Sequence, residues 1–578
     1  MTEVVVGIDF GSSGSGFAYA FKDNEDEIIH GTIYGANVDN KVPTEIILDD
    51  NNNTLKFGIE CIEYMKTKGT KVGYYFKEIK MNLYEKKSEI QAKNSEKKIL
   101  PLALVIQRIL EKLKDLAIAE IEKNRPFAQN NIKYVVTVPA IWEEFQKNIM
   151  MEACIKAGLI KEEDDKSLFF ALEPEAASYY CLKNKSIDQN LMKEGNYYIV
   201  CDLGGGTGDI VTHLIGVNRN VNEICPPNGG KFGSNEINKL FFKDIVFKIF
   251  DCKDYNTFYK KYKEIKKDDE DEGLLFNDWH ELEREVMDFK EGTNLQTVGE
   301  NDYYPINFGL FQDIFNNDTD INALVDKYNQ NCDNSELKLK IKSKKKWVIG
   351  FPRKIIFNYI EKQVNSICEI INNILEYDKG INSIILVGGY CSNEVLISEI
   401  KKQLSNKISY FLKPSKPCLS VMEGAVLFGL NPNKIIQRKA RYTIGIKTNA
   451  NWNEELHSKN GKKYYSKADN TWRCENCFGI FIKVNESIQI GQEIIKKFLF
   501  NNPKSCIIYF YKTLKSNPIF INEEGIEEIG KLRLDAVKDF PPLERDLTIT
   551  MRVGGTFIDV KAKHLKSGTT IKIQFDFN

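Results

Sequence analysis

The sequence lacks the features that mark several large functional classes. Its 80 lysines and arginines nearly balance its 81 aspartates and glutamates, so a net charge of −1 argues against a dominant nucleic-acid or membrane surface. No stretch reaches the ~18 apolar residues that a transmembrane helix needs. The first residues, MTEVVVGIDF, carry neither the basic region nor the long apolar segment of a signal peptide. We therefore expect a cytoplasmic protein that binds neither nucleic acid nor membranes.

Motifs for two common chemistries are also missing. The five histidines form no HExxH pattern, and no Gly-x-x-x-x-Gly-Lys-Ser/Thr segment is present, which excludes zincin-type and P-loop chemistry. The thirteen cysteines are odd in number and dispersed, as expected for reduced thiols. Cys474 and Cys477 form a lone CxxC, with Cys506 as an isolated cysteine nearby. Because a zinc site needs two more ligands at matching spacing, we interpret the pair as structural thiols.

What the chain does contain is one pattern that occurs twice. An apolar strand ends in an aspartate, a Gly/Ser-rich turn follows, and a second strand resumes; this happens at residues 4–21 and again at 197–217. The repeat predicts a duplicated fold with one phosphate-binding hairpin in each lobe. With 578 residues and 42% hydrophobic side chains, the chain can form roughly three to five compact units with a large core.

The composition of these turns suits a nucleotide. Glycine has no Cβ, so several backbone N–H groups can approach a phosphate, and a carboxylate at the strand end can hold Mg²⁺ through water. Two such turns that face each other would hold a magnesium triphosphate from both sides. Gly388 and Gly389 follow another buried strand and could form a backbone platform for adenosine. The alternatives are glycine hairpins that bind nothing and, at 388–389, a plain helix-entry turn.

Six segments occur in the order found in the seventy-kilodalton heat-shock chaperones: VVVGIDFGSSGSGFAYAF, VVTVPAIWEE, ALEPEAASYY, YYIVCDLGGGTGDIVTHL, SIILVGGYCSNEVL and VMEGAVLFGL. The chain resembles this family of the actin-like ATPase superfamily. Residues 75–84 and 229–241 are most similar to its atypical twelve-type (A/B) branch. The resemblance implies an α/β fold, with a duplicated actin-like (ribonuclease H-like), two-lobed ATPase domain followed by a β-rich C-terminal domain.

The implied boundaries are a nucleotide-binding domain at 1–434 and a β-rich, substrate-binding-like domain at 440–578. Within the first domain, lobe I covers about 1–196, lobe II about 197–380 with a charged helical insertion at 238–346, and a closing segment 381–434. A basic linker, 434–439, separates the domains. The long helix before the buried strand at 383–387 is expected over 351–375.

The family also implies roles for residues at matching positions. The resemblance assigns Asp9 and Asp202 to Mg²⁺ through water, and Glu173, Asp202 and Thr207 to catalysis, with Glu173 orienting the attacking water. Another interpretation of Glu173 is an acidic residue satisfied by a helix N-terminus. The residues expected to contact ATP or ADP are Gly11, Ser12, Ser13, Gly14, Gly204, Gly205, Gly206, Thr207, Gly229, Gly230, Gly388 and Gly389.

One departure from the family affects catalysis. Ile62 occupies the position where the ordinary chaperones have a lysine, and Lys66, Lys77 or Lys80 could substitute for it. Hydrolysis is thus less secure than binding, because a missing cation removes stabilisation from phosphoryl transfer. We expect an ATP-binding, chaperone-like protein with nucleotide-driven lobe closure, weak ATPase activity and a protein client on the β-rich domain. The alternatives are a non-hydrolysing nucleotide-binding scaffold and a small-molecule kinase of the same superfamily.

Overall fold

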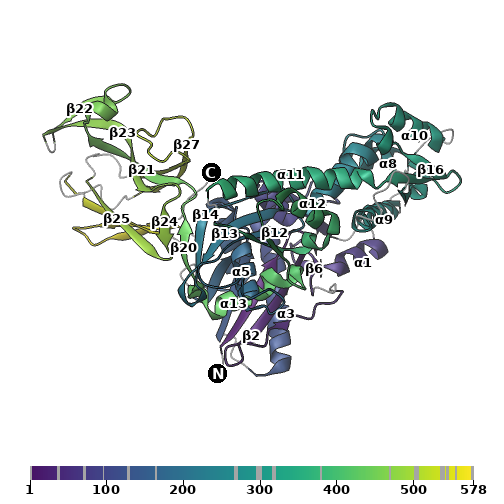
Figure 1. Cartoon of the computed structure of the whole chain (residues 1–578), viewed down its shortest axis with the longest axis horizontal. Helices are drawn as coiled ribbons and strands as arrows, with labels where there is room; N and C mark the ends of the chain where they lie inside the picture. Colours follow the sequence, from purple (N-terminus) through teal and green to yellow (C-terminus); the bar gives the residue numbers. More distant parts are fainter. Residues whose placement is uncertain are drawn as a thin grey trace.

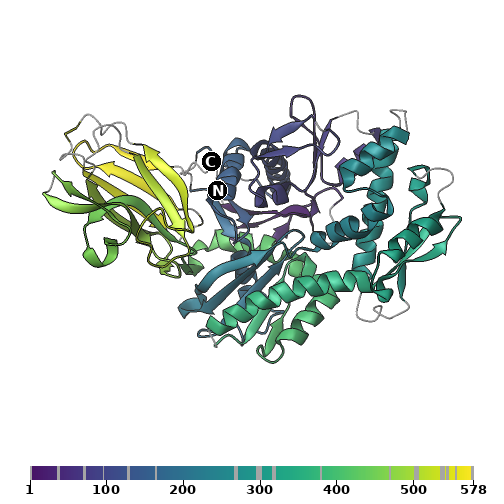
Figure 2. The same cartoon turned by 90° about the horizontal axis from the view of Figure 1, so that it is seen from above.

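The computed structural model describes residues 3–573 except for short segments. The segments left out are 36–39, 69–72, 96, 127–130, 163–165, 266–270, 294–301, 315–319, 378–379, 468–469, 500–506, 534–539, 542–545, 554–555 and 557. The described chain is a mixed α/β structure, as expected, with two large sheets in the middle, a helical insertion at one end and two antiparallel sheets at the other (Figures 1 and 2). Among the described residues, no helix combines the length and apolar composition that crossing a membrane requires.

The first large sheet contains the first copy of the repeated pattern. Its strand order is β11-β10-β1-β2-β3, with β4 also paired to β2. The hairpin of β1 and β2 is antiparallel, and β1 runs parallel to β10, so β1 is buried along its whole length. The strands are β1 (Val4–Phe10), β2 (Gly14–Phe21), β3 (Ile29–His30), β4 (Val42–Pro43), β10 (Ile132–Val138) and β11 (Leu168–Leu172).

Helices cover this sheet. α13 packs on β1 and β10 and against α5, while α3 packs on β2 and against α4. α3 follows the predicted apolar spacing, with its buried residues recurring every three or four positions. The helices are α3 (Leu102–Asn124), α4 (Glu144–Lys156), α5 (Glu173–Lys183) and α13 (Ser420–Leu430).

A smaller layer lies beside the first hairpin and positions the short helix α2. The three-stranded sheet β6-β5-β7 and the hairpin β8-β9 form this layer together with α1. The elements are β5 (Ile46–Leu48), β6 (Thr54–Phe57), α1 (Ile59–Lys68), β7 (Tyr74–Phe76), α2 (Ile79–Tyr84), β8 (Glu89–Gln91) and β9 (Ile99–Pro101).

The second large sheet contains the second copy of the pattern. Its order is β19-β18-β12-β13-β14-β20-β24; β12 and β13 form an antiparallel hairpin, and β12 runs parallel to β18. The pairing of β12 with its two neighbours therefore repeats the pairing of β1 with β2 and β10. The strands are β12 (Tyr197–Leu203), β13 (Gly208–Ile215), β14 (Val221–Gly230), β18 (Ser383–Val387), β19 (Tyr410–Leu412), β20 (Ile435–Lys439) and β24 (Ser487–Gln489); α12 (Glu394–Leu404) follows β18.

The segment predicted as a basic linker is a strand of this second sheet. β20 runs parallel to β14 and antiparallel to β24, which comes from the C-terminal part of the chain. Its Arg438 donates to both carboxylate oxygens of Glu175, at 2.7 and 2.5 Å, and Glu175 is fully buried. A guanidinium matches a carboxylate in this bidentate way, and this pairing fixes the strand against α5.

The insertion contains strands as well as the expected helices. The predicted helix over 351–375 begins later than expected, because Phe351 and Pro352 end β17 and pair with β15; the helix, α11, is Lys354–Tyr377. The other insertion elements are α6 (Ser234–Phe241), α7 (Phe247–Ile249), α8 (Tyr255–Ile265), α9 (Asp271–Glu291), β15 (Tyr303–Asn307), α10 (Ile321–Gln330), β16 (Lys340–Ser343) and β17 (Val348–Pro352).

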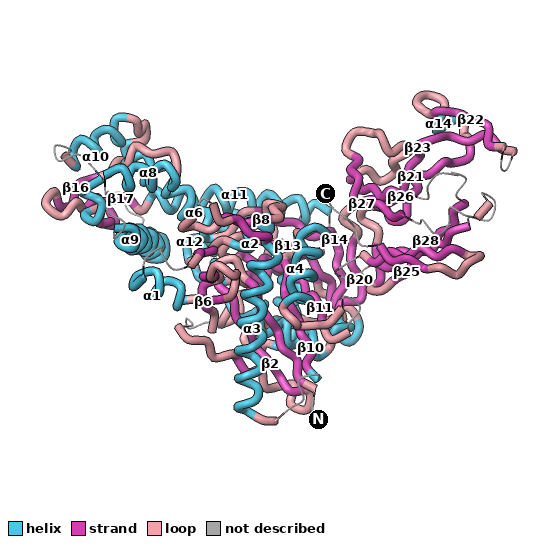
Figure 3. Tube along the Cα trace, turned by 180° about the vertical axis from the view of Figure 1, so that it is seen from behind, coloured by secondary structure: helices cyan, strands magenta, loops and turns pink. Residues whose placement is uncertain are grey.

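The C-terminal part forms two antiparallel sheets, in the orders β22-β23-β21-β26-β27 and β25-β28-β29-β30 (Figure 3). Side chains from both sheets share one apolar core. Alternating burial along β28 and β29 explains why the sequence shows alternating polarity there. The elements are β21 (Thr443–Asn451), α14 (Glu454–His457), β22 (Lys462–Ser466), β23 (Thr471–Ile482), β25 (Gln492–Leu499), β26 (Ile507–Thr513), β27 (Ile526–Arg533), β28 (Asp546–Val553), β29 (Asp559–His564) and β30 (Thr570–Ile573).

Candidate nucleotide site

The two glycine turns lie against each other. A Cβ added to Gly205 would overlap the Ser13 hydroxyl oxygen, and one added to Gly206 would lie 2.5 Å from that of Ser12. Only glycine allows this approach, since any side chain would force the turns apart. The first turn therefore presents its serine hydroxyls to the backbone of the second, as expected if both turns hold one phosphate chain.

Four carboxylates lie buried beneath the turns. Asp9 lies near the end of β1, Asp202 lies near the end of β12, Asp209 is in β13, and Glu173 begins α5; they are between 1% and 7% exposed. Asp202 and Asp209 are direct partners across the β12–β13 hairpin. Asp202, Asp209 and Asp9 each act electrostatically on Glu173, so the residues that precede the two turns share one site.

Two lysines, one buried and one partly exposed, partly neutralise these carboxylates. Lys41 Nζ lies 2.6 Å from Asp9 Oδ2. Lys80, which is 4% exposed, forms an ion pair with Glu173, and its ammonium lies 5.8 Å from the centre of the Trp142 ring. The charge of Asp9 and its hydrogen bond outweigh the effect of burial on Lys41 and raise the pKa of that ammonium.

The four carboxylates and two lysines leave a charge of −2 when all are ionised (2 − 4 = −2). Burial raises the pKa of Asp202 to about 7, reinforced by the charges of Asp209 and Asp9. Burial also raises the pKa of Glu173, although the charge of Lys80 opposes this shift. The pKa of Asp209 is raised by burial as well, against the hydrogen bond from the Ile141 N–H group. A divalent cation would supply the missing charge, so the residues present fit Mg²⁺.

The arrangement favours coordination through water. Among the described residues, these carboxylates do not form a group whose oxygen atoms all lie within 4.8 Å of one another. Mg²⁺ loses its water ligands reluctantly and is commonly held by one or two carboxylates through them. Asp9 and Asp202 are suitable for that role because each is the next-to-last residue of a strand that leads into a turn.

The glycines expected around adenosine differ in their surroundings. Gly388 has φ 86°, and a Cβ there would lie 2.6 Å from Asp202 Oδ1, so this glycine is required by packing against β12. At Gly389 no described atom lies within 4 Å of an added Cβ. Gly389 thus borders open space beside the acid cluster, which suits a backbone platform for a flat ligand.

Other predicted residues lie close by. Thr207 closes the second turn, where its carbonyl accepts from the N–H group of Gly204 at 3.0 Å. Gly229 and Gly230 lie in β14 opposite Asp209 and Gly208, one strand away from the turn. Gly229 has to be small because the carbonyl of Gly208 occupies the place of a Cβ, so a nucleotide contact there stays a prediction.

The structure distinguishes the three lysines that could replace the one missing at Ile62. Lys66 pairs with Glu281 at 3.5 Å and Lys77 with Glu283 at 2.9 Å, whereas Lys80 contacts Glu173. Of these three lysines, Lys80 is therefore the one that lies among the carboxylates of the site.

The sequence analysis missed two members of the site. Asp209 has a visible signal, because it mirrors Asp202 across the glycine turn. Lys41 has none, since it lies in a polar, Asn-rich stretch.

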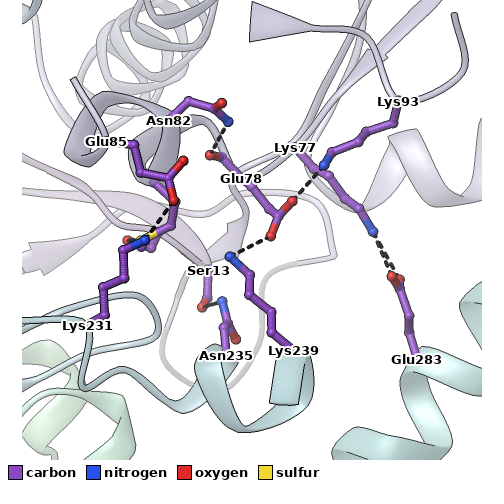
Figure 4. Close-up of polar contacts among 12 residues, drawn as sticks. Ser13, Lys77, Glu78, Asn82, Glu85, Lys93, Lys231, Asn235, Lys239 and Glu283 are labelled. Atoms are coloured by element: carbon purple, nitrogen blue, oxygen red, sulfur yellow. Dashed lines mark hydrogen bonds and ion pairs between the residues drawn. The ribbon is translucent and has the colours of Figure 1, made fainter. Parts of the chain in front are cut away.

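Polar contacts connect N-terminal segments of the chain to the region of α6 and α9 (Figure 4). Ion pairs join the segment 77–85 to side chains of α6, α9 and the strand end before α6, and a hydrogen bond joins Ser13 to Asn235. Glu78, the left-handed residue before α2, pairs with both Lys93 and Lys239, and these two lysines lower the pKa of its partly exposed carboxyl against the effect of burial. The contacts are Lys77–Glu283 at 2.9 Å, Glu78–Lys239 at 3.0 Å, Glu85–Lys231 at 2.7 Å and Ser13–Asn235 at 2.9 Å.

Together these features define an α/β protein with a candidate site for a phosphate chain and a cation between two sheets. The chain is similar to heat shock 70 kDa protein 12A of Mus musculus and of Homo sapiens, with 25% identity over 99% of this chain and 91% of each relative. It is 24% identical to heat shock 70 kDa protein 12B of Homo sapiens over the same shares. No family model matches the chain. These relatives confirm the resemblance to the atypical twelve-type branch and indicate an Hsp70-like, nucleotide-binding protein.

Proposed function

We propose that this chain is an ATP-binding, chaperone-like protein that holds magnesium ATP between two lobes and hydrolyses it slowly. The observation that carries the proposal is the contact of Ser12 and Ser13 with Gly206 and Gly205 above four buried carboxylates. Within the proposal, residues 1–434 form a duplicated, actin-like domain and 440–578 a β-rich domain. The equal pairing of β1 and β12 with their neighbours supports the duplication.

In this proposal the residues divide between binding and charge compensation. The hydroxyls of Ser12 and Ser13 and the backbone of Gly205 and Gly206 bind phosphate oxygens. Asp9 and Asp202 hold Mg²⁺ through water, and the ion, when bound, neutralises part of the phosphate charge. Gly389 supports the adenosine from its open side.

Hydrolysis is supported by the position of Lys80. Its ammonium compensates the cation missing at Ile62 and lies beside Glu173, the residue proposed to orient the attacking water. Thr207 adds a hydroxyl at the end of the second turn. This chemistry needs correct placement more than strong basicity, so rigid packing of Lys80 against Trp142 is an advantage.

Phosphate release and calorimetry test the proposal. Wild type should bind ATP with Mg²⁺ and release phosphate slowly. Lys80→Met and Glu173→Gln should each reduce turnover by about 100-fold or more, as expected when one transition-state contact is lost. Lys66→Met is the matched control, because its lysine pairs on the surface with Glu281. Equal turnover in all four proteins would remove the catalytic assignment, and absence of ATP binding would remove the proposal itself.

A non-hydrolysing scaffold is the second candidate, and one observation favours it. Glu173 is already engaged by Lys80, and its pKa is raised by burial, so it is a poor partner for water while that pair persists. Tight ATP binding without phosphate release would select this function. A small-molecule kinase is less favoured, because it does not explain the sheets at 443–573 or the similarity to heat-shock relatives over 99% of the chain.

A protein client and a cytoplasmic location complete the proposal. Exposed apolar side chains of the C-terminal part, among them Trp472 in β23 and Leu514 just after β26, at 53% and 72% exposure, offer surfaces for an unfolded protein. The full chain should then suppress light scattering by an aggregating client protein, and Trp472→Ser with Leu514→Ser should weaken this effect. Suppression that is unchanged in the double variant would contradict the placement of the client surface.

A further inference from the structure

Three ligand-type side chains converge in the C-terminal sheets, away from the nucleotide site. Cys474 and Cys477 lie in β23, and His457 is the last residue of α14. One ligand atom from each lies within 4.8 Å of the other two, and all three residues are buried. Cys477 Sγ is 4.0 Å from His457 Nε2. Figure 1 shows β22 and β23 at the outer end of these sheets.

The strand is distorted in a way that produces this cluster. In a regular strand, residues three positions apart point to opposite faces, so Cys474 and Cys477 would separate. In β23 the register shifts, because Thr448 pairs with Cys477 and Ala450 pairs with Cys474. An advance of three residues along β23 therefore corresponds to an advance of two residues along β21. Asn476 takes up the extra residue in a left-handed conformation, with φ 59°. The bulge turns both sulfurs to the same side, a device that recurs at functional sites.

The surroundings support metal ligands. The backbone N–H group of Lys462 donates to the Cys474 sulfur, a contact of the kind that orients a metal ligand. A Cβ added to Gly461 would lie 2.8 Å from the same sulfur, so glycine is needed for the loop to close over the cluster. The ring of Phe520 lies 5.9 Å from that of His457 and covers its side.

We propose that His457 Nε2 and the sulfurs of Cys474 and Cys477 form a zinc site. Thiolates with imidazole are the ligand set that zinc prefers, and three protein ligands leave the fourth tetrahedral position to water or an external ligand. Within the described part of the chain, no fourth histidine, cysteine or carboxylate joins the group. The bound metal would fasten α14 and the loop 458–461 to β23.

Zinc binding changes the protonation of all three ligands. The N–H group of Asn453 donates to His457 Nδ1 at 3.0 Å, so the proton of the neutral ring is on Nε2 without metal. Zinc binding releases both thiol protons to solvent and moves the ring proton from Nε2 to Nδ1, which displaces the Asn453 hydrogen bond. Losing one hydrogen bond is a small cost compared with the affinity of a thiolate site for zinc.

Metal analysis of the full-length protein, purified without a histidine tag, tests the site. Wild type should carry about one zinc per chain, as expected for one three-ligand site. Cys474→Ser, Cys477→Ser and His457→Gln should each lose most of it. Cys332→Ser is the matched control, since this partly exposed cysteine lies in the insertion, and should retain it. The proposal would be overturned if the zinc content were equal in wild type and all variants. A Cys474–Cys477 disulfide that persists in the presence of a reducing agent would also overturn it.

Cobalt separates a real site from misfolded variants. Cobalt-loaded wild type should show a sulfur-to-cobalt charge-transfer band, and His457→Cys should retain the metal with a stronger band because a third thiolate replaces the imidazole. Absence of this band in wild type would also refute the site. Calorimetry should give the same ATP affinity for Cys474→Ser as for wild type, so this result is independent of the proposed function.

Discussion

Lys80→Met is the most direct perturbation of the candidate site. In wild type, Lys80 and Glu173 form a buried ion pair, with both residues less than 10% exposed. Methionine keeps most of the side-chain volume and removes only the charge. Glu173 is then left without its cation, next to Asp202, Asp209 and Asp9. Removing one partner of a buried ion pair typically costs ~3–5 kcal/mol of stability.

Protonation of Glu173 sets an upper limit to this cost. A carboxyl with an ordinary pKa of 4.5 needs about 3.4 kcal/mol to be protonated at pH 7, which is 2.5 pH units at ~1.36 kcal/mol each. Glu173 will accept a proton in the folded state once its charged form costs more than that. Burial already raises the pKa of this carboxyl in wild type, so part of that cost is present before the substitution. Because the folded state then binds the extra proton, the penalty should be at most about 3 kcal/mol at pH 7 and at most about 1.4 kcal/mol at pH 5.5.

Urea unfolding at pH 5.5 and 7.0 checks this prediction. Lys80→Met combined with Glu173→Gln removes both charges and should recover stability to within ~1 kcal/mol of wild type, as expected when a buried pair is replaced together. Turnover should stay lost in the double variant. Lys66→Met should cost at most ~0.5 kcal/mol. A penalty that is independent of pH, or a double variant as unstable as the single one, would refute the reasoning.

Three further predictions concern other parts of the molecule. Gly389→Ala should leave the melting temperature unchanged, since the new methyl group meets no described atom, but should weaken ATP binding by ~5-fold or more in calorimetry; unchanged affinity would contradict the platform role. Burial raises the pKa of Glu223 to about 8, so wild type should lose stability as pH rises from 4.5 to 8. In thermal denaturation, Glu223→Gln should be on the order of 2 kcal/mol more stable than wild type near pH 9 and similar to it near pH 5. If variant and wild type are equally stable at both pH values, this carboxyl is not desolvated. Glu283→Ala removes the ion pair between Lys77 and α9. This change should speed release of a fluorescent ATP analogue ~3-fold in stopped flow at low salt, and the difference from wild type should vanish near 1 M salt. A difference that persists at 1 M salt would point to packing instead of charge.

The sequence predicts the parts of the fold that local patterns determine. The two strand–aspartate–turn hairpins are found at the expected residues, because the glycines and the buried apolar runs act over a few positions. The start of α11 was misplaced, since helical periodicity continues into Phe351 and Pro352 and only the pairing of β17 with β15 makes these residues a strand. Residues 435–439 likewise gain their strand partners only from β14 and β24.

The residues of the site that escaped prediction depend on contacts distant in sequence. Lys41 lies 32 positions from Asp9, and no local pattern selects it among its neighbours. Lys80 lies 93 positions from Glu173, so the sequence names it as a candidate but cannot choose it over Lys66 or Lys77. His457 is similar, because only the bulge in β23 and the loop after α14 bring it beside Cys477. The glycines, serines and aspartates of a turn can be recognised in the sequence. The lysines that neutralise a buried carboxylate cannot, because they come from whichever elements the fold packs against it.

One segment, 140–143, contacts both the acid cluster and the connection between β20 and β21, which leads into the C-terminal sheets. The backbone N–H group of Ile141 donates to Asp209 at 2.9 Å, and the ring of Trp142 faces the ammonium of Lys80. From the other side, the Arg441 guanidinium donates to the carbonyl of Trp142 at 3.2 Å. A cation that keeps Asp209 ionised strengthens its bond to Ile141, because a charged acceptor binds an N–H group more strongly. The charge state of Asp209 therefore acts on the backbone of segment 140–143, whose Trp142 carbonyl is bonded to Arg441. A continuous set of contacts thus leads from the acid cluster to the residue that precedes the C-terminal sheets.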